Sequence, residues 1–200
     1  MIITAIEPRR KALSAVYIDG EFALKLDTMT LAENRINIGA KLDDNELKEL
    51  IEKSDARRAK EKALWLISYR DHSKKELQDK IKKTTSSEAA ETAIERMEEL
   101  GLINDETFAR RYADELLQRK HMAPKGIVYK LREKGIDSKL IDIIIEEIEY
   151  DYVGEIAQLL QRKYPNAAED EKSRRRATAF LQRLGYSWDE IKKAISQIES

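Results

Sequence analysis

The sequence predicts a mainly α-helical protein, in which tandem three-helix repeats form an elongated arrangement that can curve, preceded by a small N-terminal β-hairpin. Three observations indicate this fold class. A turn signal lies near the N-terminus, apolar residues recur at helical spacing beyond residue 28, and one pattern of basic and apolar residues returns every 50 positions. A row of stacked repeats has a large surface for its volume, which agrees with the high charged fraction of 38%.

The composition excludes several classes of function. The 200 residues carry 37 basic and 38 acidic side chains, so the net charge of −1 gives no indication of nucleic-acid binding. The absence of cysteine excludes disulfides, thiol catalysis and cysteine-ligated zinc. Residues 1–5 lack the pattern of a signal peptide, and no apolar run reaches membrane-spanning length. We therefore expect a cytoplasmic protein that does not enter a membrane.

The N-terminal turn signal is Asp19-Gly20, which lies between the β-prone segments 15–18 and 21–26. An Asp-Gly pair in this setting is a strong predictor of a β-hairpin. Alternate residues of the second segment are expected to share one buried face: Phe22, Leu24 and Leu26. Residues 1–6 are a candidate third strand. Further on, Asp43 and Glu46 have the spacing of a capping box, which predicts a helix start.

An internal repeat occupies most of the remaining chain. Each copy has a small residue, then basic residues, then apolar positions four apart. The three copies are Ser73-Lys74-Lys75 with Leu77 and Ile81, Ala123-Pro124-Lys125 with Ile127 and Leu131, and Ser173-Arg174-Arg175-Arg176 with Ala177 and Leu181. Glycine followed by an apolar residue predicts Schellman helix stops at Gly101-Leu102, Gly135-Ile136 and Gly185-Tyr186.

These signals divide the chain into four segments. Residues 1–42 form the hairpin and a connecting segment, and residues 43–104 form the first repeat with a leading helix. Residues 105–150 form the second repeat, and residues 151–200 form the third. Each repeat is expected to contain three helices.

Three segments, Tyr69–Leu77, Leu100–Ala109 and Lys130–Ile136, resemble the RecX regulatory proteins of bacteria in their residues, order and spacing. The resemblance includes the hairpin and covers nearly the whole chain. Residues 121–126 depart from it, because the family more often has further glycine and arginine there. The resemblance implies a non-enzymatic modulator of the recombinase RecA that lodges in the groove of the RecA–DNA filament and limits its growth or promotes its disassembly.

Charge is distributed in blocks. Residues 57–83 carry a net charge of +6 and residues 110–134 a net charge of +5, whereas residues 86–107 and 137–155 each carry −6. Basic blocks thus fall on the first and second helices of a repeat, and acidic blocks fall on the third. The basic blocks either align into a stripe that binds phosphates or are neutralised by neighbouring helices.

The candidate binding residues are cations at predicted helix starts. Ser73 and Glu76 predict a capping box around Lys74 and Lys75, where the helix dipole disfavours a cation. A helix start with nearby cations suits a phosphate or carboxylate. The candidate residues for filament or DNA-phosphate binding are Lys74, Lys75, Lys125, Arg132, Arg174, Arg175 and Arg176. The alternative is that these side chains extend into water and bind nothing.

Aromatic residues mostly indicate core. Trp65, Phe108, Tyr112, Phe180 and Trp188 are expected to be buried. Tyr129 lies between Lys125 and Arg132 on one helix face, where it either stacks on a base or a partner side chain or packs against the next repeat.

The sequence offers no enzyme signature. His72 and His121 are the only histidines, and there is no phosphate-binding loop and no His-Glu-x-x-His helix, so we expect neither catalysis nor a cofactor or metal. The hypothesis is a monomeric regulator of the RecA filament, most consistent with inhibition, that binds single- or double-stranded DNA weakly on its own. The alternatives are an autonomous DNA-binding module, as three-helix units can be, and a helical scaffold for another partner.

Overall fold

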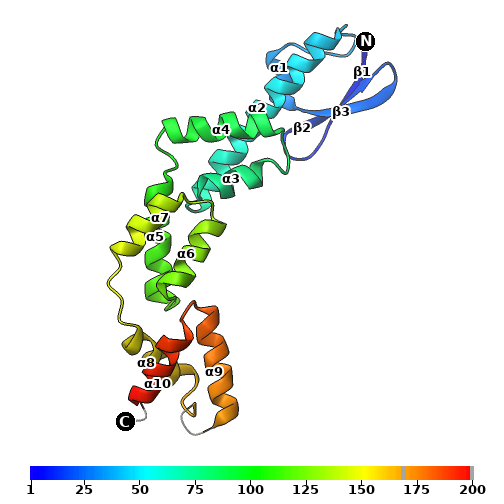
Figure 1. The fold of residues 1–200 in the computed structure, drawn as a ribbon. Helices are drawn as coiled ribbons and strands as arrows, with labels where there is room; N and C mark the ends of the chain where they lie inside the picture. The colour runs from blue at the N-terminus through cyan, green and yellow to red at the C-terminus, as the bar shows by residue number, and fades with distance from the viewer. Residues whose placement is uncertain (168–169, 199–200) are drawn as a thin grey trace. The chain divides into compact units, whose positions relative to one another are not determined.

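The N-terminal segment forms a three-stranded antiparallel sheet in the computed structural model, which describes residues 1–167 and 170–198. The strands β1 (Ile3–Pro8), β2 (Leu13–Ile18) and β3 (Glu21–Asp27) lie side by side in chain order (Figure 1). Asp19 and Gly20 have φ angles of 50° and 91°, as a type I′ hairpin turn requires. The predicted hairpin and the candidate third strand are confirmed.

The predicted burial of β3 is only partly correct. Leu26 is 1% exposed and Leu24 is half-buried, but Phe22 is 54% exposed. The strand register shifts between Val16 and Tyr17. Phe22 contacts the Tyr17 ring edge-on, with 5.9 Å between the two ring centroids. The apolar cluster that covers the sheet reaches Leu26 and Leu24, so the residue next to the turn is left outside it.

One long helix, α2 (Asp44–Tyr69), connects the sheet to the helical part of its unit. The predicted capping box at its start is present, because the side chains of Asp43 and Glu46 each accept a backbone N–H of the other. The short helix α1 (Thr28–Glu33) begins at Asp27. Ser54 of α2 accepts the Asp27 N–H at 2.8 Å, which attaches the helix to the end of β3.

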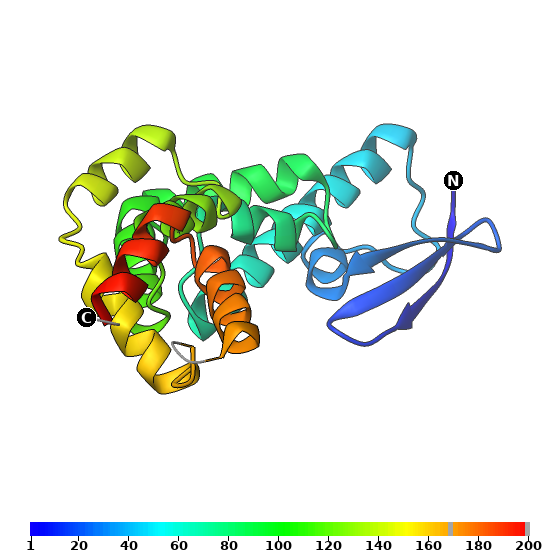
Figure 2. The ribbon, with the colours of Figure 1, turned by 60° about the horizontal axis from the view of Figure 1, so that its bottom comes forward.

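Each repeat consists of three helices, as predicted. The first contains the second half of α2, α3 (Lys74–Ile81) and α4 (Ser87–Glu99); the second contains α5 (Asp105–Asp114) with its π-helical extension η1 (Glu115–Arg119), α6 (Pro124–Glu133) and α7 (Ser138–Glu146); the third contains α8 (Tyr152–Lys163), α9 (Glu171–Arg183) and α10 (Trp188–Ile198). Figures 1 and 2 show α8 and α10 side by side in the third repeat.

The repeat spacing of 50 residues is confirmed by the cores. The apolar pair on the second helix is 0% exposed in every copy: Leu77 and Ile81, Ile127 and Leu131, and Ala177 and Leu181. Each pair lies in a separate hydrophobic cluster. Burial of one such leucine or isoleucine contributes roughly 1.5–3 kcal/mol, so each repeat has its own source of stability.

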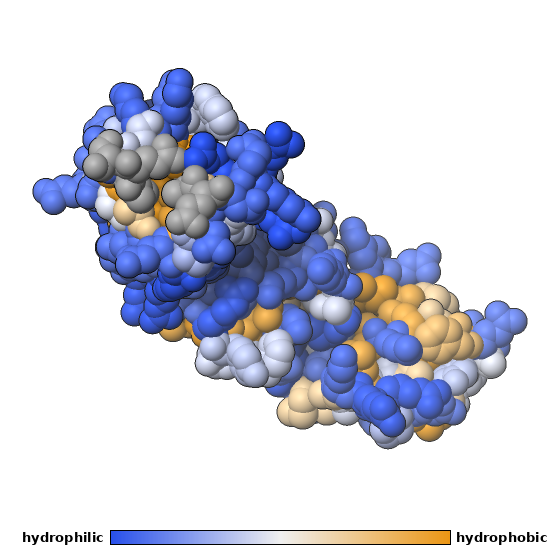
Figure 3. All heavy atoms as spheres, turned by 90° about the horizontal axis from the view of Figure 1, so that it is seen from below, coloured by the Kyte–Doolittle hydropathy of each residue, from blue (hydrophilic) through white to orange (hydrophobic). Residues whose placement is uncertain are grey.

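The chain divides into two compact units, Met1–Ile103 and Asn104–Ser200. The first unit contains the sheet and the first repeat, and the second contains the other two repeats. Hydrophilic side chains cover most of the face shown in Figure 3, in keeping with the charged fraction of 38%.

Two of the five aromatic residues predicted to be core are exposed. Trp65 is 56% and Trp188 is 60% exposed, whereas Phe108 is buried, and Tyr112 and Phe180 are half-buried. The buried face of α2 is formed by small and aliphatic residues, and Trp65 points away from it. Trp188 is the first residue of α10, whose inward positions begin three residues later.

Asp27 is a buried carboxylate that connects three elements. It is 2% exposed, accepts the backbone N–H and the hydroxyl of Thr30 at 2.9 and 3.0 Å, and lies 3.3 Å from Nε of Arg57 on α2. We expect Asp27→Ala to lower the free energy of unfolding by about 2–3 kcal/mol, because a helix cap and the partner of a cation are both lost. Urea denaturation followed by circular dichroism measures this loss.

The matched control is Asp43→Ala, which removes the exposed N-cap of α2 and no buried contact. It should cost about 1 kcal/mol. Equal losses in the two variants would show that the buried contacts of Asp27 contribute nothing beyond the cap.

Candidate functional site

The second and third repeats meet where two glycines bring their backbones together. A Cβ atom on Gly185 would lie 2.3 Å from the backbone nitrogen of Gly126, and one on Gly126 would lie 2.3 Å from the Leu184 carbonyl oxygen. Gly185 also has a φ of 98°, which side-chain-bearing residues rarely adopt. Both glycines are therefore required for this approach.

Hydrogen bonds hold the same joint. The Ala123 N–H donates to the Leu184 carbonyl at 3.0 Å, and the Tyr186 hydroxyl donates to the His121 carbonyl at 3.0 Å. His121 Nδ1 lies 2.6 Å from a carboxylate oxygen of Glu155 on α8. The start of α6 is thus covered by the α9–α10 turn.

A groove of about 450 Å³ opens beside the joint. The second repeat contributes Lys125, Tyr129, Lys130 and Arg132 from α6, and the third contributes Arg183 near the end of α9. None of the described residues that line the groove is acidic. The fold therefore brings four cations and two tyrosines, Tyr129 and Tyr186, to a single concave surface.

The cations of the groove differ in how they are held. Lys130 donates to Glu133 at 2.7 Å, and this hydrogen bond raises the pKa of Lys130 and lowers the pKa of Glu133. Within residues 1–167 and 170–198, Lys125, Arg132 and Arg183 form no ion pair. These three cations can bind an external anion without first losing a carboxylate partner.

Tyr129 is 61% exposed at the edge of this groove, and Lys130 Nζ lies 5.4 Å from the centre of its ring. Of the two alternatives for Tyr129, packing of its ring against the next repeat is therefore wrong, and the ring is accessible to a ligand. Tyr186, at the base of the groove, is buried, and burial raises its pKa to about 12. Its hydroxyl therefore stays protonated and keeps its hydrogen bond to His121.

The predicted helix-start position is wrong for Arg174, Arg175 and Arg176. Helix α9 begins at Glu171, and Asp170 caps it by accepting the Ser173 N–H at 2.7 Å. The arginines therefore lie in the second turn, beyond the free N–H groups of the helix start. An aspartate three residues before Ser173 supplies a better cap than the serine aligned with Ser73, so the helix begins earlier.

In the first repeat, neutralisation between neighbouring helices accounts for part of the basic block. Ser73 caps α3 as predicted, and Lys74 forms an ion pair with Glu98 of α4. Lys82 pairs with Glu91 of the same helix at 3.1 Å. Lys75 is exposed and forms no ion pair with another described residue.

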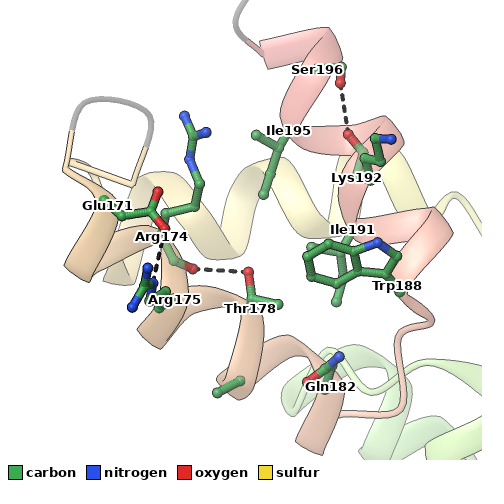
Figure 4. Close-up of a pocket in the computed structure, with 11 residues that line it drawn as sticks. Glu171, Arg174, Arg175, Thr178, Gln182, Trp188, Ile191, Lys192, Ile195 and Ser196 are labelled. Carbon is green, nitrogen blue, oxygen red and sulfur yellow. Dashed lines mark hydrogen bonds and ion pairs between the residues drawn. The ribbon is translucent and has the colours of Figure 1, made fainter.

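The seven predicted binding residues are thus not all brought together. Lys125 and Arg132 line the groove beside the joint, whereas Arg174 and Arg175 line a second hollow between α9 and α10 (Figure 4). Arg176 lines neither, and Lys74 and Lys75 belong to the other unit.

Sequence reasoning missed Lys130 and Arg183, which complete the groove, and the exposed Trp188, which lines the second hollow. Arg183 reaches the groove only because the neighbouring repeat docks there. The exposure of Trp188 could have been predicted from the repeats. The third helix begins with a serine in the first two repeats, Ser87 and Ser138, and Trp188 stands at the same position in the third.

The described residues contain no group of three or more histidine, cysteine, aspartate or glutamate side chains placed to hold a metal ion. Among the helices of the same residues, none combines the length and the apolar character needed to cross a membrane.

Comparison with known proteins follows the same division into repeats. Residues 59–97 match the family model described as RecX, first three-helix domain, residues 104–143 match the second, and residues 150–195 match the third. The regulatory protein RecX of Caldanaerobacter subterraneus subsp. tengcongensis is 29% identical over 201 residues, which cover 98% of this chain and 99% of the relative. That of Chlorobium phaeobacteroides is 31% identical over 147 residues, covering 72% and 96%.

The fold has a counterpart among solved structures. A crystal structure of regulatory protein RecX superposes with a TM-score of 0.59 at 22% identity, covering 98% of both chains. At this identity the likeness concerns the fold alone.

The joint itself can be tested with Gly185→Ala. The added methyl group would collide with Gly126 and force a left-handed backbone onto alanine, so we expect a loss of about 3 kcal/mol or more in the stability of the second unit. Urea denaturation monitored by circular dichroism reports the change.

Gly101→Ala is the control for backbone strain alone. Gly101 has a φ of 68°, and a methyl group added to it would meet no heavy atom within 4 Å, so alanine should cost only about 1–2 kcal/mol. If both variants lost the same stability, the close approach of Gly126 and Gly185 would carry no energetic weight.

Proposed function

Because the chain belongs to the RecX family of regulatory proteins, we propose that it binds the RecA–DNA filament and limits recombinase activity in DNA repair and homologous recombination. It acts by binding and not by catalysis, as a cytoplasmic monomer without a cofactor. The inhibitory direction follows from the resemblance to the family. The proposed divisions remain residues 1–42, 43–104, 105–150 and 151–200.

The observation that carries this proposal is the cationic groove beside the Gly126–Gly185 joint. A RecA–DNA filament presents DNA phosphates and protein carboxylates, and both are bound by lysine and arginine side chains through charge-assisted hydrogen bonds. Lys125, Arg132 and Arg183 have no competing carboxylate within the described residues. Tyr129 offers an exposed ring between them for a base or for a side chain of the partner.

Affinity in this proposal comes from several weak contacts. Exposed cations such as Lys75 on α3 and Arg176 on α9 add to those of the groove, one set on the second helix of each repeat. Each exposed charge contributes little alone, since water and salt screen it. A partner that spans several repeats sums these contributions.

Autonomous DNA binding is the weaker alternative. The acidic blocks at residues 86–107 and 137–155 balance the basic ones, and the net charge is −1. Long-range attraction to naked DNA is therefore small, whereas a filament that also offers protein contacts compensates for it. We expect weak, salt-sensitive binding to single- or double-stranded DNA alone.

The test is a triple charge reversal, Lys125→Glu, Arg132→Glu and Arg183→Glu. We expect the concentration needed to inhibit DNA-dependent ATP hydrolysis and strand exchange by the cognate RecA to rise by about tenfold or more, against roughly twofold for each single reversal. A titration of naked DNA is run beside these assays.

The control reverses three exposed cations that line neither hollow: Lys139, Arg162 and Lys193. It changes the net charge equally and should leave inhibition close to the wild-type level. Unaltered RecA activity in the presence of the wild-type chain would refute the proposed function. Tight binding to naked DNA with a steep salt dependence, without an effect on RecA, would favour the autonomous DNA-binding module.

A further inference from the structure

The third repeat carries a second hollow, of about 410 Å³, between α9 and α10. Figure 4 shows Trp188 beside Ile191 on α10, with Ile195 further along the same helix and Thr178 across from them on α9. Ile191 is 1% exposed and forms the floor, whereas Trp188 is 60% exposed and forms one wall. The hollow is thus an apolar recess with an exposed indole at its edge.

The hollow exists because the third repeat differs from the second in residues on the surface of α9 and in the first residue of α10. Thr178 and Ala179 stand where the second repeat has Val128 and Tyr129, so the surface of α9 is lowered. Trp188 stands where the second repeat has Ser138, so the opposite wall is raised. The second repeat thus has a three-helix fold with a serine at the position that Trp188 occupies in the third repeat.

The same face is closed to a further repeat of this kind. In the second repeat, Gly126 allows the backbone at Gly185 to approach α6. The equivalent residue of α9 is Arg176, an exposed arginine. A side chain at this position prevents the backbone approach, which leaves the face of α9 accessible to a different kind of partner.

The rim of the hollow is cationic. Arg174, Arg175 and Lys192 line it, and the one acidic residue in the lining, Glu171, accepts a hydrogen bond from Arg175 Nε at 2.9 Å. Lys192 forms no ion pair with another described residue. An occupant must therefore match an apolar recess at the centre and positive charge at the edge.

The geometry points to an acidic peptide segment as the occupant, with one large apolar side chain inserted against Trp188 and flanking carboxylates paired with Arg175 and Lys192. An amphipathic helix or extended segment fits such a recess through a single anchor. Single-stranded nucleic acid fits less well, because it is bound by successive aromatic rings along a cationic track, and this hollow offers one ring above an aliphatic floor. The inference does not depend on the RecA hypothesis.

The probes are three synthetic peptides in which glutamates flank a single phenylalanine, leucine or tryptophan, each with a fluorescent label. Anisotropy titrations against the full chain give their affinities. Binding should be saturable for at least one of them below about 1 mM, and the same peptide with lysines in place of glutamates should bind at least tenfold more weakly.

Two variants locate the site. Ala179→Tyr places the residue of the second repeat into the hollow and should abolish binding, and Lys192→Glu should weaken it about tenfold. Lys193→Glu, at the next position on α10 and outside the lining, is the matched control and should bind within about twofold of the wild type. Ala179 is exposed, so circular dichroism is expected to show an unchanged fold for Ala179→Tyr.

A second readout uses the tryptophan itself. The chain has two tryptophans, so in a Trp65→Phe background the emission of Trp188 reports on the hollow alone. The acidic peptide should shift this emission to shorter wavelength as the indole becomes covered.

Three outcomes would overturn the inference. No saturable binding of any acidic peptide, equal binding of the lysine peptide, or binding that survives Ala179→Tyr would each do so. A labelled oligothymidylate that binds and is lost in the same variants, while the peptides do not bind, would assign the hollow to nucleic acid. The triple reversal of Lys125, Arg132 and Arg183 should leave peptide binding intact, which separates this test from that of the RecA hypothesis.

Discussion

The contact between the backbones of Gly126 and Gly185 is the constraint on which the second unit depends. Two backbone segments approach this closely only where neither residue has a Cβ atom. One of the two residues, Gly185, must also adopt a positive φ. The contact places the end of α9 beside α6, and so brings Arg183 of one repeat to the groove that Lys125 and Arg132 line in the other. The groove is therefore a property of the joint between two repeats and is absent from either alone.

The repeats share a core and differ in surface. Their second helices bury the same apolar pair, but the residue just before that pair is Glu76, Gly126 or Arg176. Glycine at this position lets the backbone of the third repeat approach α6 of the second. In the third repeat, the side chain of Arg176 would block the same kind of approach to α9. The exchange of Gly126 for Arg176 thus distinguishes the face of α6, which contacts the next repeat, from the equivalent face of α9, which we propose binds a different partner.

The sequence predicts the features that depend on local or periodic patterns. The Asp-Gly turn and the capping box at Asp43 were predicted because each forms within a few residues. The buried apolar pairs were predicted because the two members lie four residues apart and the pair recurs every 50 residues. A local sequence does not always set the helix type: residues 116–120 and 159–163 have the same five-residue sequence, yet most of the first segment is π-helical and the second is α-helical.

The candidate site was predicted less completely than the fold, because it depends on which side chains tertiary packing brings together. Periodicity cannot tell which apolar face of a helix finds a partner, so Trp65 and Trp188 were assigned to the core, whereas both are exposed and other residues, mostly alanine, leucine and isoleucine, fill the cores. Charge blocks identify cations but not their partners. In the first repeat the acidic helix α4 neutralises α3 through Lys74 and Lys82, whereas in the second repeat Glu147, at the end of α7, pairs with Arg110 of α5. Among the described residues, no carboxylate forms an ion pair with Lys125, Arg132 or Arg183, so a chain with a net charge of −1 retains a cationic groove beside the joint.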